Sequence, residues 1–377
     1  MENIKPIVAF MKIMKLKHYV ISSLVIAALA GCSSDLPNPA PCPGPTGIVA
    51  EIQDNQMYAA TDYIAQAASA YKGQNWVISP YSTLRTLGLL YNAADYQNAT
   101  EYRSVLNLKE NITPADVNQY NLWQEKYYKR NDCESEIYYS NKFELSDSIT
   151  SVAGKYDIDL SAVKNADYAV KATDENDISL TNNSFPMYFA GTVSFENADN
   201  TVTTSTGLAL TGSAIEVTEN GTIVAIFSRA SGMTLSFYLP NGSFEDYPFA
   251  SEVLNKMIRS IKPNLKRKYV VLPDLDIDFN ADITSLLVDM GMKNSFGMVS
   301  PDSYRAMFNA VPNSDVKFIY ETSSSFEMEY PDYNERPEEM TNAINPSEAF
   351  VIDRPFYFTL RNDEIVICAG AVTNLNK

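Results

Sequence analysis

Apolar residues recur at helical spacing in the first third of the chain. The run 57–71 has apolar positions three and four residues apart, which predicts a helix. Ser79 followed by Pro80 is typical of a helix start with proline in the first turn, so a second helix is predicted over 80–94. A third helix is expected over 114–129, and the apolar residues 137–139 then predict the start of a strand.

Two stretches nearer the end of the chain carry strand patterns. Residues 350–360 read F-V-I-D-R-P-F-Y-F-T-L, an aromatic and apolar run that predicts a buried strand with proline near its start. No packing rule requires a charged pair directly before that proline. Upstream, Asp274, Asp276 and Asp278 alternate with other residues, so they share one face of a strand. We expect that face to be in water, because three buried carboxylates would repel one another.

The run 350–360 resembles the signature of the serpin family, and four other stretches resemble the same family in the same order along the chain. These stretches are 75–82 (N-W-V-I-S-P-Y-S), 233–240 (M-T-L-S-F-Y-L-P), 272–296, which ends in G-x-x-x-x-F, and 370–374, which has the form G-x-V-x-N. The resemblance covers residues 55–377 and is weakest between 110 and 220.

The resemblance implies an α+β serpin fold in one domain over 51–377. It would have a large mixed or antiparallel central sheet, smaller sheets and about eight helices. The run 178–195 resembles the long central strand of the main sheet. Between 162 and 177 the chain is too short and too polar for the helix that normally covers this sheet, so we expect that helix to be truncated or absent.

The same resemblance assigns two groups of residues to known parts of the fold. The shutter, where the strands of the main sheet part, and the signature strand would contain Ser79, Pro80, Ser82, Asn182, Asp353, Arg354, Pro355 and Phe356. The family's shutter histidine, expected near Val316, is missing, and Val193 stands where the family has a tryptophan.

Members of this family display a reactive loop as bait for a protease. The protease acylates on the loop, and the cut loop then inserts as a new strand into the main sheet and distorts the protease. The leading hinge must be small and uncharged, because alternate side chains enter a closing sheet. The resemblance places the loop at 322–349, with the hinge at Thr322, Ser323, Ser324, Ser325, Phe326 and Glu327.

The hinge departs from the family pattern after its serines. Phe326, Glu327 and Glu329 stand where small residues are expected, and burying an unpaired charge costs several kcal/mol. Pro331 would also remove a hydrogen bond from the sheet. We therefore expect insertion past Ser325 to be costly.

Two ways of counting along the loop give two scissile sites. Counting from the hinge points to Met340, followed by Thr341, and counting back from the signature points to Ile344, followed by Asn345. Either site suits an elastase-like or chymotrypsin-like protease. Arg336 is the alternative, but Pro337 after it blocks most trypsin-like cleavage.

The first residues predict export and lipidation. Residues 14–30 have a basic start and an apolar run that is too short to span a bilayer comfortably, and Leu29-Ala30-Gly31-Cys32 then resembles a lipobox. We therefore expect a signal over 1–31, acylation of Cys32, and a proline-rich tether over 32–50. This predicts an outer-membrane lipoprotein of a Gram-negative cell envelope, facing either the surface or the periplasm.

Composition and net charge argue against several classes of partner and catalytic site. The chain has a net charge of −17, and removal of a signal with four lysines and one glutamate changes it to −20, so nucleic acid is not expected as a partner. The only histidine, His18, lies in the signal, which removes Ser-His and Cys-His nucleophile pairs and His-ligated metals. We expect no metal, no cofactor and no enzymatic activity, and a monomer. A pairing of Cys42 with Cys133 is left open.

Two functions of different classes follow. The first is a tethered inhibitor of serine proteases, with cysteine proteases as a second target class. The second is a serpin-fold binding or structural lipoprotein that has lost inhibition, which the hinge chemistry favours.

Overall fold

The computed structural model describes most of the chain from residue 44 to residue 375. The gaps are 212, 229–230, 245, 247, 261–268, 301–303, 305, 310–315, 329–348 and 363–364. Pro45–Lys377 forms one compact unit.

Seven α-helices lie within the described residues. They are α2 (Ile48–Ala70), α3 (Pro80–Leu90), α4 (Tyr96–Val105), α5 (Pro114–Tyr128), α6 (Asp147–Ala153), α7 (Ser251–Asn255) and α8 (Thr284–Asp289). The three helices predicted in the first third of the chain are confirmed as α2, α3 and α5. Ser79 caps α3 by accepting a hydrogen bond from the Ser82 amide at 3.3 Å, with Pro80 in the first turn.

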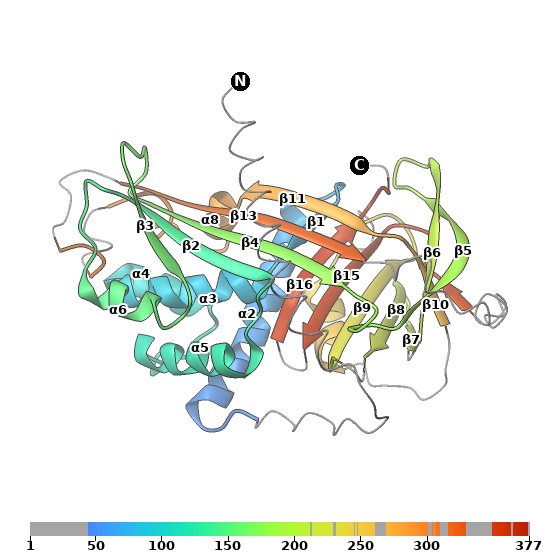
Figure 1. Cartoon of the computed structure of the whole chain (residues 1–377), viewed down its shortest axis with the longest axis horizontal. Coiled ribbons are helices and arrows are strands. Elements are labelled where there is room, and N and C mark those ends of the chain that lie inside the picture. Colours follow the sequence, from blue (N-terminus) through green and yellow to red (C-terminus); the bar gives the residue numbers. More distant parts are fainter. Residues whose placement is uncertain are drawn as a thin grey trace, which may run out of the picture. The chain divides into compact units, whose positions relative to one another are not determined.

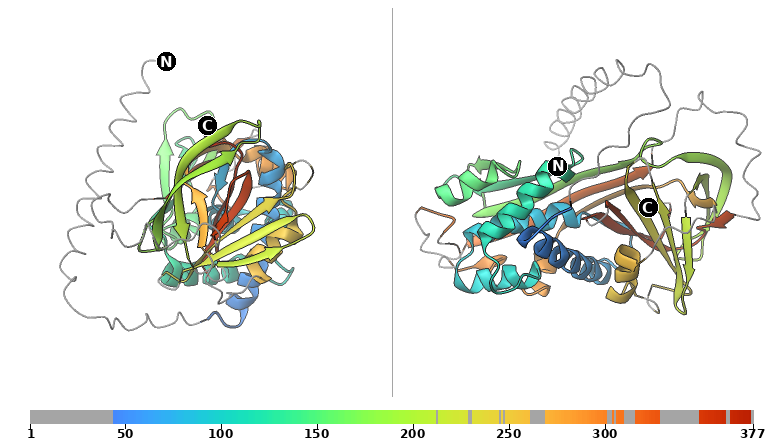
Figure 2. Two further views of the ribbon diagram at one scale, coloured as in Figure 1. Left: turned by 90° about the vertical axis from the view of Figure 1, so that its right-hand side faces the viewer. Right: turned by 90° about the horizontal axis from the view of Figure 1, so that it is seen from below.

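The central sheet contains β13, the longest strand among the described residues, and lies over helices α3 to α5 (Figure 1). Its strand order is β11 (Asp276–Asp282), β13 (Val316–Met328), β4 (Val170–Leu180), β2 (Cys133–Ser140) and β3 (Asp159–Val163). The short strand β12 (Gly297–Val299) pairs with the start of β13. Seen from below, the helices lie in front of these strands (Figure 2).

Two further sheets complete the unit. The second sheet has the order β1 (Trp76–Ile78), β16 (Ile365–Val372), β15 (Phe356–Asn362), β9 (Met233–Pro240), β8 (Gly221–Phe227) and β7 (Ser213–Val217). The third sheet has the order β14 (Ala349–Val351), β10 (Tyr269–Pro273), β6 (Val202–Leu210) and β5 (Met187–Glu196).

Gly370 allows β1, β16 and β15 to pack closely. A Cβ atom at this position would lie 2.4 Å from the backbone oxygen of Trp76 and 2.6 Å from the ring of Phe358. The backbone atom cannot move away without breaking the pairing of β1 with β16. A glycine at position 370 is therefore required for these three strands to pack.

The helix expected to be truncated or absent over the central sheet is absent from the described residues. β3 ends at Val163 and β4 begins at Val170, and the six residues between them form turns. The outer face of β4 and β13 is consequently not covered by a helix from this connection. Asp276 and Asp278 of β11 are exposed, as predicted, and Asp274 is also exposed but lies before the strand begins.

The prediction of one long strand over 178–195 is wrong. β4 ends at Leu180, residues 181–186 turn, and β5 begins at Met187 in a different sheet. Two hydrogen bonds hold the turn. The Thr181 amide donates to the Ser184 hydroxyl at 3.0 Å, and the Ser184 hydroxyl donates to the Thr181 carbonyl at 2.8 Å.

Candidate functional site

The site that the sequence pointed to lies where β13 meets β4, a junction we call the seam. The two strands run parallel, and their register joins Phe318 to Val170 at one end and Met328 to Leu180 at the other. They are direct hydrogen-bonded neighbours, so the described residues place no strand between them. β11 lies on the far side of β13, and β2 lies on the far side of β4.

Polar side chains occupy the inner face of the seam, toward the helices. Alternation along β4 buries Asp174 and Asn176, and alternation along β13 buries Tyr320, Thr322 and Ser324. A buried polar group is costly unless it is hydrogen-bonded, so the partners of these groups decide how firmly the seam closes.

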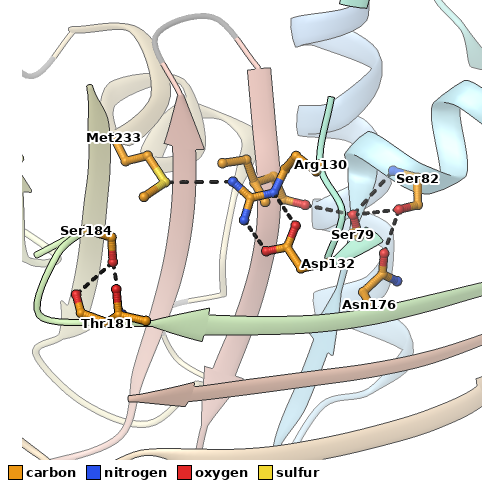
Figure 3. A network of polar contacts seen from close by, with 9 residues as sticks. Ser79, Ser82, Arg130, Asp132, Asn176, Thr181, Ser184 and Met233 are labelled. Atoms are coloured by element: carbon orange, nitrogen blue, oxygen red, sulfur yellow. Dashed lines mark hydrogen bonds and ion pairs between the residues drawn. The ribbon is translucent and has the colours of Figure 1, made fainter. Parts of the chain in front are cut away.

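One chain of hydrogen bonds runs from the second sheet through α3 to the seam (Figure 3). The Ser79 hydroxyl donates to the Ile367 carbonyl at 2.8 Å and lies 3.2 Å from the Ser82 hydroxyl. The Ser82 hydroxyl donates to the Asn176 side-chain oxygen at 2.5 Å. The Asn176 amide then donates to the Ser324 hydroxyl at 3.0 Å, which joins β4 to β13.

A second cluster surrounds Asp174, which is 1% exposed. Four hydroxyl groups from three different elements donate to its carboxylate. They are Tyr320 of β13 at 2.8 Å, Ser135 of β2 at 2.8 Å, and Thr83 and Thr86 of α3 at 3.0 and 3.3 Å. Asp174 therefore joins three neighbouring strands to the helix beneath them.

Burial dominates the ionisation of this carboxyl group. It raises the pKa of Asp174 to about 6, and the hydrogen bonds from the four hydroxyl groups lower it only in part. Burial and the neighbouring carboxylate also raise the pKa of Tyr320 well above its ordinary value. Tyr320 therefore acts as a neutral donor.

The outer face of the seam is polar and acidic. Lys171 of β4 pairs with Glu321 of β13 at 2.6 Å, and the Ser325 hydroxyl donates to Asp177 at 3.3 Å. A groove of about 610 Å³ runs across this face, and both Asp174 and Thr322 contribute to its lining. The groove is thus uncovered on the outer face, while the carboxylate of Asp174 is buried on the inner face.

The hinge residues lie in a paired strand. Thr322, Ser323, Ser324, Ser325, Phe326 and Glu327 are all within β13, which continues to Met328. The predicted loop start at residue 322 is wrong, because these residues form ladder pairs with both β11 and β4. Phe326 is already buried and packs on Phe358 of β15 with ring centroids 4.6 Å apart, while Glu327 points to the outer face.

The assignment of Asn182 to the shutter is also wrong. Its exposed side chain accepts a hydrogen bond from the Met187 amide at 2.8 Å, within the turn that follows β4. Asn176, six positions earlier, makes the contacts with Ser82 and Ser324 instead. Ser79, Pro80 and Ser82 do lie together at the start of α3 beneath the seam.

The signature residues connect the third sheet to the second. Arg354 donates to the Pro240 carbonyl at 3.3 Å and pairs with Asp353 at 3.3 Å. Pro355 immediately precedes β15, so its missing amide removes no hydrogen bond from that strand. Phe356 is fully buried, with its ring edge-to-face against Phe237 at 5.5 Å.

Several predicted residues lie outside the described part of the chain. The scissile candidates Arg336, Met340, Thr341, Ile344 and Asn345 are among them, as are Cys32 and Cys42. Cys133 is buried, and burial raises the pKa of its thiol to about 12. Its pairing with Cys42 stays a prediction.

The described residues contain no group of three or more histidine, cysteine or acidic side chains arranged to hold a metal ion. Within the same part of the chain, none of the helices combines the length and the apolar character needed to cross a bilayer.

Sequence reasoning missed the Asp174 cluster. Period two along β4 places Asp174 on the same face as Ala172, Asn176 and Ile178, so the alternation itself could have indicated its burial. Its partners Thr83, Ser135 and Tyr320 come from distant parts of the chain, and no local pattern joins them.

Comparisons with known proteins agree with this geometry. Residues 214–375 match the family model for serpins, described as serine protease inhibitors. No curated protein matches the chain. Three solved structures with high similarity are a highly specific serpin of the insect Tenebrio molitor, native protease nexin-1 with heparin, and the thermophilic serpin tengpin in its native state.

The three structural similarities extend over nearly the whole fold at low sequence identity. The insect serpin has a TM-score of 0.67 at 15% identity, covering 86% of this chain and 98% of that one. Protease nexin-1 has a TM-score of 0.67 at 14% identity, covering 87% of this chain and 100% of that one. Tengpin has a TM-score of 0.68 at 14% identity, covering 88% of this chain and 96% of that one. The chain therefore has the serpin fold, and its residues 214–375 match the serpin family model.

Proposed function

We propose that this protein is a serpin-type inhibitor of serine proteases that offers residues 329–348 as bait. The observation that carries the proposal is the seam. β13 and β4 are adjacent and parallel, so a strand running antiparallel to both could enter between them and pair on each side. The chain segment available for this begins directly after β13, at residue 329.

The attachment points of that segment support the proposal. β13 ends in the central sheet, and the chain returns as β14, which is the edge strand of the third sheet and pairs with β10. A segment of 20 residues therefore connects two different sheets, which is the connectivity of a serpin bait loop. Once cut, its first half could move independently of β14.

The sequence of the segment suggests the target class. Met340 and Ile344 are apolar residues that fit the pockets of chymotrypsin-like and elastase-like proteases. Arg336 precedes Pro337, which disfavours trypsin-like cleavage. The pattern at residues 14–32 supports a lipid anchor in the cell envelope, with the inhibitor held off the membrane by the tether over 32–50.

A second candidate function is a binding or structural serpin that no longer inhibits. The bait segment carries carboxylates at both odd and even positions, with Glu329, Glu335 and Glu339 in one set and Asp332 and Glu338 in the other. Whichever set faces the core on insertion, charges lose water. Separation of β13 from β4 for insertion would also break the hydrogen bonds from Tyr320 to Asp174 and from Asn176 to Ser324.

Incubation with chymotrypsin and with pancreatic elastase separates the two functions. An inhibitor forms a complex that survives denaturing electrophoresis and has the mass of the protease plus the cleaved serpin. A chain that is cut within 331–344 without any such complex is a substrate, and this outcome overturns the proposal in favour of the binding role. Trypsin serves as the control protease, and we expect little complex with it.

A further inference from the structure

The inner face of the seam contains one carboxylate among the described residues, Asp174. Tyr320 reaches it from β13, and Ser135 reaches it from β2. Because β2 pairs directly with β4, Ser135 stays beside Asp174 when β13 and β4 separate, whereas Tyr320 moves away with β13. Opening of the seam therefore removes one donor from the carboxylate and gives access to water.

The groove on the outer face of the seam lies beside this position. Asp174 and Thr322 both line the groove on the outer face, although each side chain is at most 3% exposed. The register pairs Thr322 with Asp174. A separation of these two residues would connect the groove to the buried carboxylate.

Among the described residues, the ionisable groups that face Asp174 offer no positive charge to compensate it. Tyr320 from β13 and Tyr63 from α2 interact with it electrostatically, and both have raised pKa values that keep them neutral. Ser135 from β2, and Thr83 and Thr86 from α3, do not titrate. Arg85 of α3 is engaged elsewhere, because it pairs with Glu125 at 2.7 Å and donates to the Tyr156 carbonyl.

We propose that Asp174 is a positioning residue that sets how readily the seam opens, and that its ionised form favours the open seam. This inference deepens the proposed function, because the loop insertion proposed above requires this opening. The closed seam holds the carboxylate where burial outweighs its hydrogen bonds, whereas an open seam lets water solvate it.

The direction of the pH dependence follows from linkage. In the closed seam the pKa of Asp174 is raised to about 6, and on exposure it falls toward the ordinary value of 3.8. The closed state therefore binds more protons between these values, so protonation stabilises it and rising pH favours opening. Between pH 4 and pH 7 the population of the open seam is expected to rise by up to about 50-fold for full exposure of this one group.

Hydrogen–deuterium exchange of the intact protein tests the inference without any protease. Exchange of amides in β13 and β4 is followed between pH 4 and pH 7.5 and corrected for the chemical exchange rate at each pH. We expect protection at the seam to fall as pH rises and to level off above about pH 6 to 7. Amides of β15 and β16 provide an internal reference that does not follow this profile.

Two asparagine substitutions in the same strand provide the matched comparison. Asp174→Asn keeps a neutral side chain of the same shape, so its seam should be protected at every pH and the profile should flatten. Asp177→Asn removes an exposed carboxylate whose partner Ser325 lies across the same seam, and it should keep the wild-type profile. Tyr320→Phe removes a donor to the ionised form, so the midpoint of the profile should move to higher pH.

The outcomes are separable from those of the protease experiment. A wild-type profile that is flat across this range overturns the inference even where Asp174→Asn fails to fold, and so does a profile that Asp177→Asn flattens equally. If the protein traps proteases but exchange at the seam does not change with pH, only the role of Asp174 is contradicted. A protein with the predicted profile that forms no complex contradicts only the proposed inhibition.

Discussion

The inner faces of the central and second sheets are built on opposite principles. β16 is buried along its whole length, from Ile365 to Val372, and its side chains are almost all apolar. β4 and β13 are buried to a similar degree on their inner faces, yet they place Asp174, Asn176, Thr322 and Ser324 there. Both sheets exclude water, but the buried polar groups of the central sheet form a connected hydrogen-bond network, whereas β16 carries no polar side chain.

This difference means that the apolar contacts of the second sheet are permanent, whereas the hydrogen bonds of the seam can be replaced by others. Apolar packing in the second sheet has no alternative that recovers its free energy, because exposure to water only costs. The hydroxyl and amide groups of the seam can exchange their partners for water or for an inserted strand at a much smaller net cost. We infer that the fold places its rigidity in the second sheet and its capacity to open in the seam.

Loss of a large side chain from the second sheet should have the largest effect. Phe358 is fully buried and packs against Phe326 of β13, so it also supports the end of the seam. Phe358→Ala should lower the free energy of unfolding by about 3–5 kcal/mol. Urea unfolding measures this, with Val217→Ala, at a position 77% exposed, as a control expected to remain within about 0.5 kcal/mol of the wild type. A loss below 1 kcal/mol would contradict the rigid role of this sheet.

Loss of the seam amide should have an intermediate effect. Asn176→Ala leaves the hydroxyls of Ser82 and Ser324 each without one partner, at a cost of about 1–3 kcal/mol in the free energy of unfolding. Asn182→Ala removes one exposed contact to the Met187 amide and should cost less than about 1 kcal/mol. Equal costs for the two variants would argue against Asn176 as the residue that joins β4 to α3.

The smallest effect should come from a hydroxyl in the second sheet. Thr359 and Ser236 are register partners, and the structure shows no hydrogen-bond partner for either buried hydroxyl among the described residues. Thr359→Val replaces the hydroxyl by a methyl group of similar size, so it should be neutral or stabilise by up to about 1 kcal/mol. Thr322→Val in the seam breaks a contact to Ser324 at 3.2 Å and should destabilise. If Thr359→Val destabilised the protein, the second sheet and the seam would not differ in their dependence on buried hydroxyl groups.

Local pattern predicted much of the fold. The start of α3 at Ser79-Pro80 and the exposed aspartates of β11 depend on neighbours in sequence, and both were predicted. The run 350–360 was predicted as one buried strand, whereas the structure divides it between β14 and β15 in two different sheets. The missing helix was predicted because residues 162–177 are too few and too polar to contain it, and the structure leaves only six residues between β3 and β4.

The candidate site was only partly predictable because it depends on register between distant strands. Asn176 and Asn182 are the same residue type on either side of a strand end, and only the pairing of β4 with β13 shows which one meets Ser324. The start of the loop was placed too early for a related reason. Small and polar residues from Thr322 to Ser325 resemble a loop, yet their alternation fits a strand whose buried side is polar.

The melting temperature before and after a single cut within residues 331–344 tests the central claim that the seam accepts a new strand. The compact unit over residues 45–377 is compared intact and cleaved. If the cut segment inserts between β13 and β4, the added strand should raise the melting temperature on the order of 10 °C or more, since each kcal/mol is about 2–4 °C for a domain approaching this size. An unchanged or lower melting temperature after complete cleavage would mean that the seam stays closed, and would contradict the account.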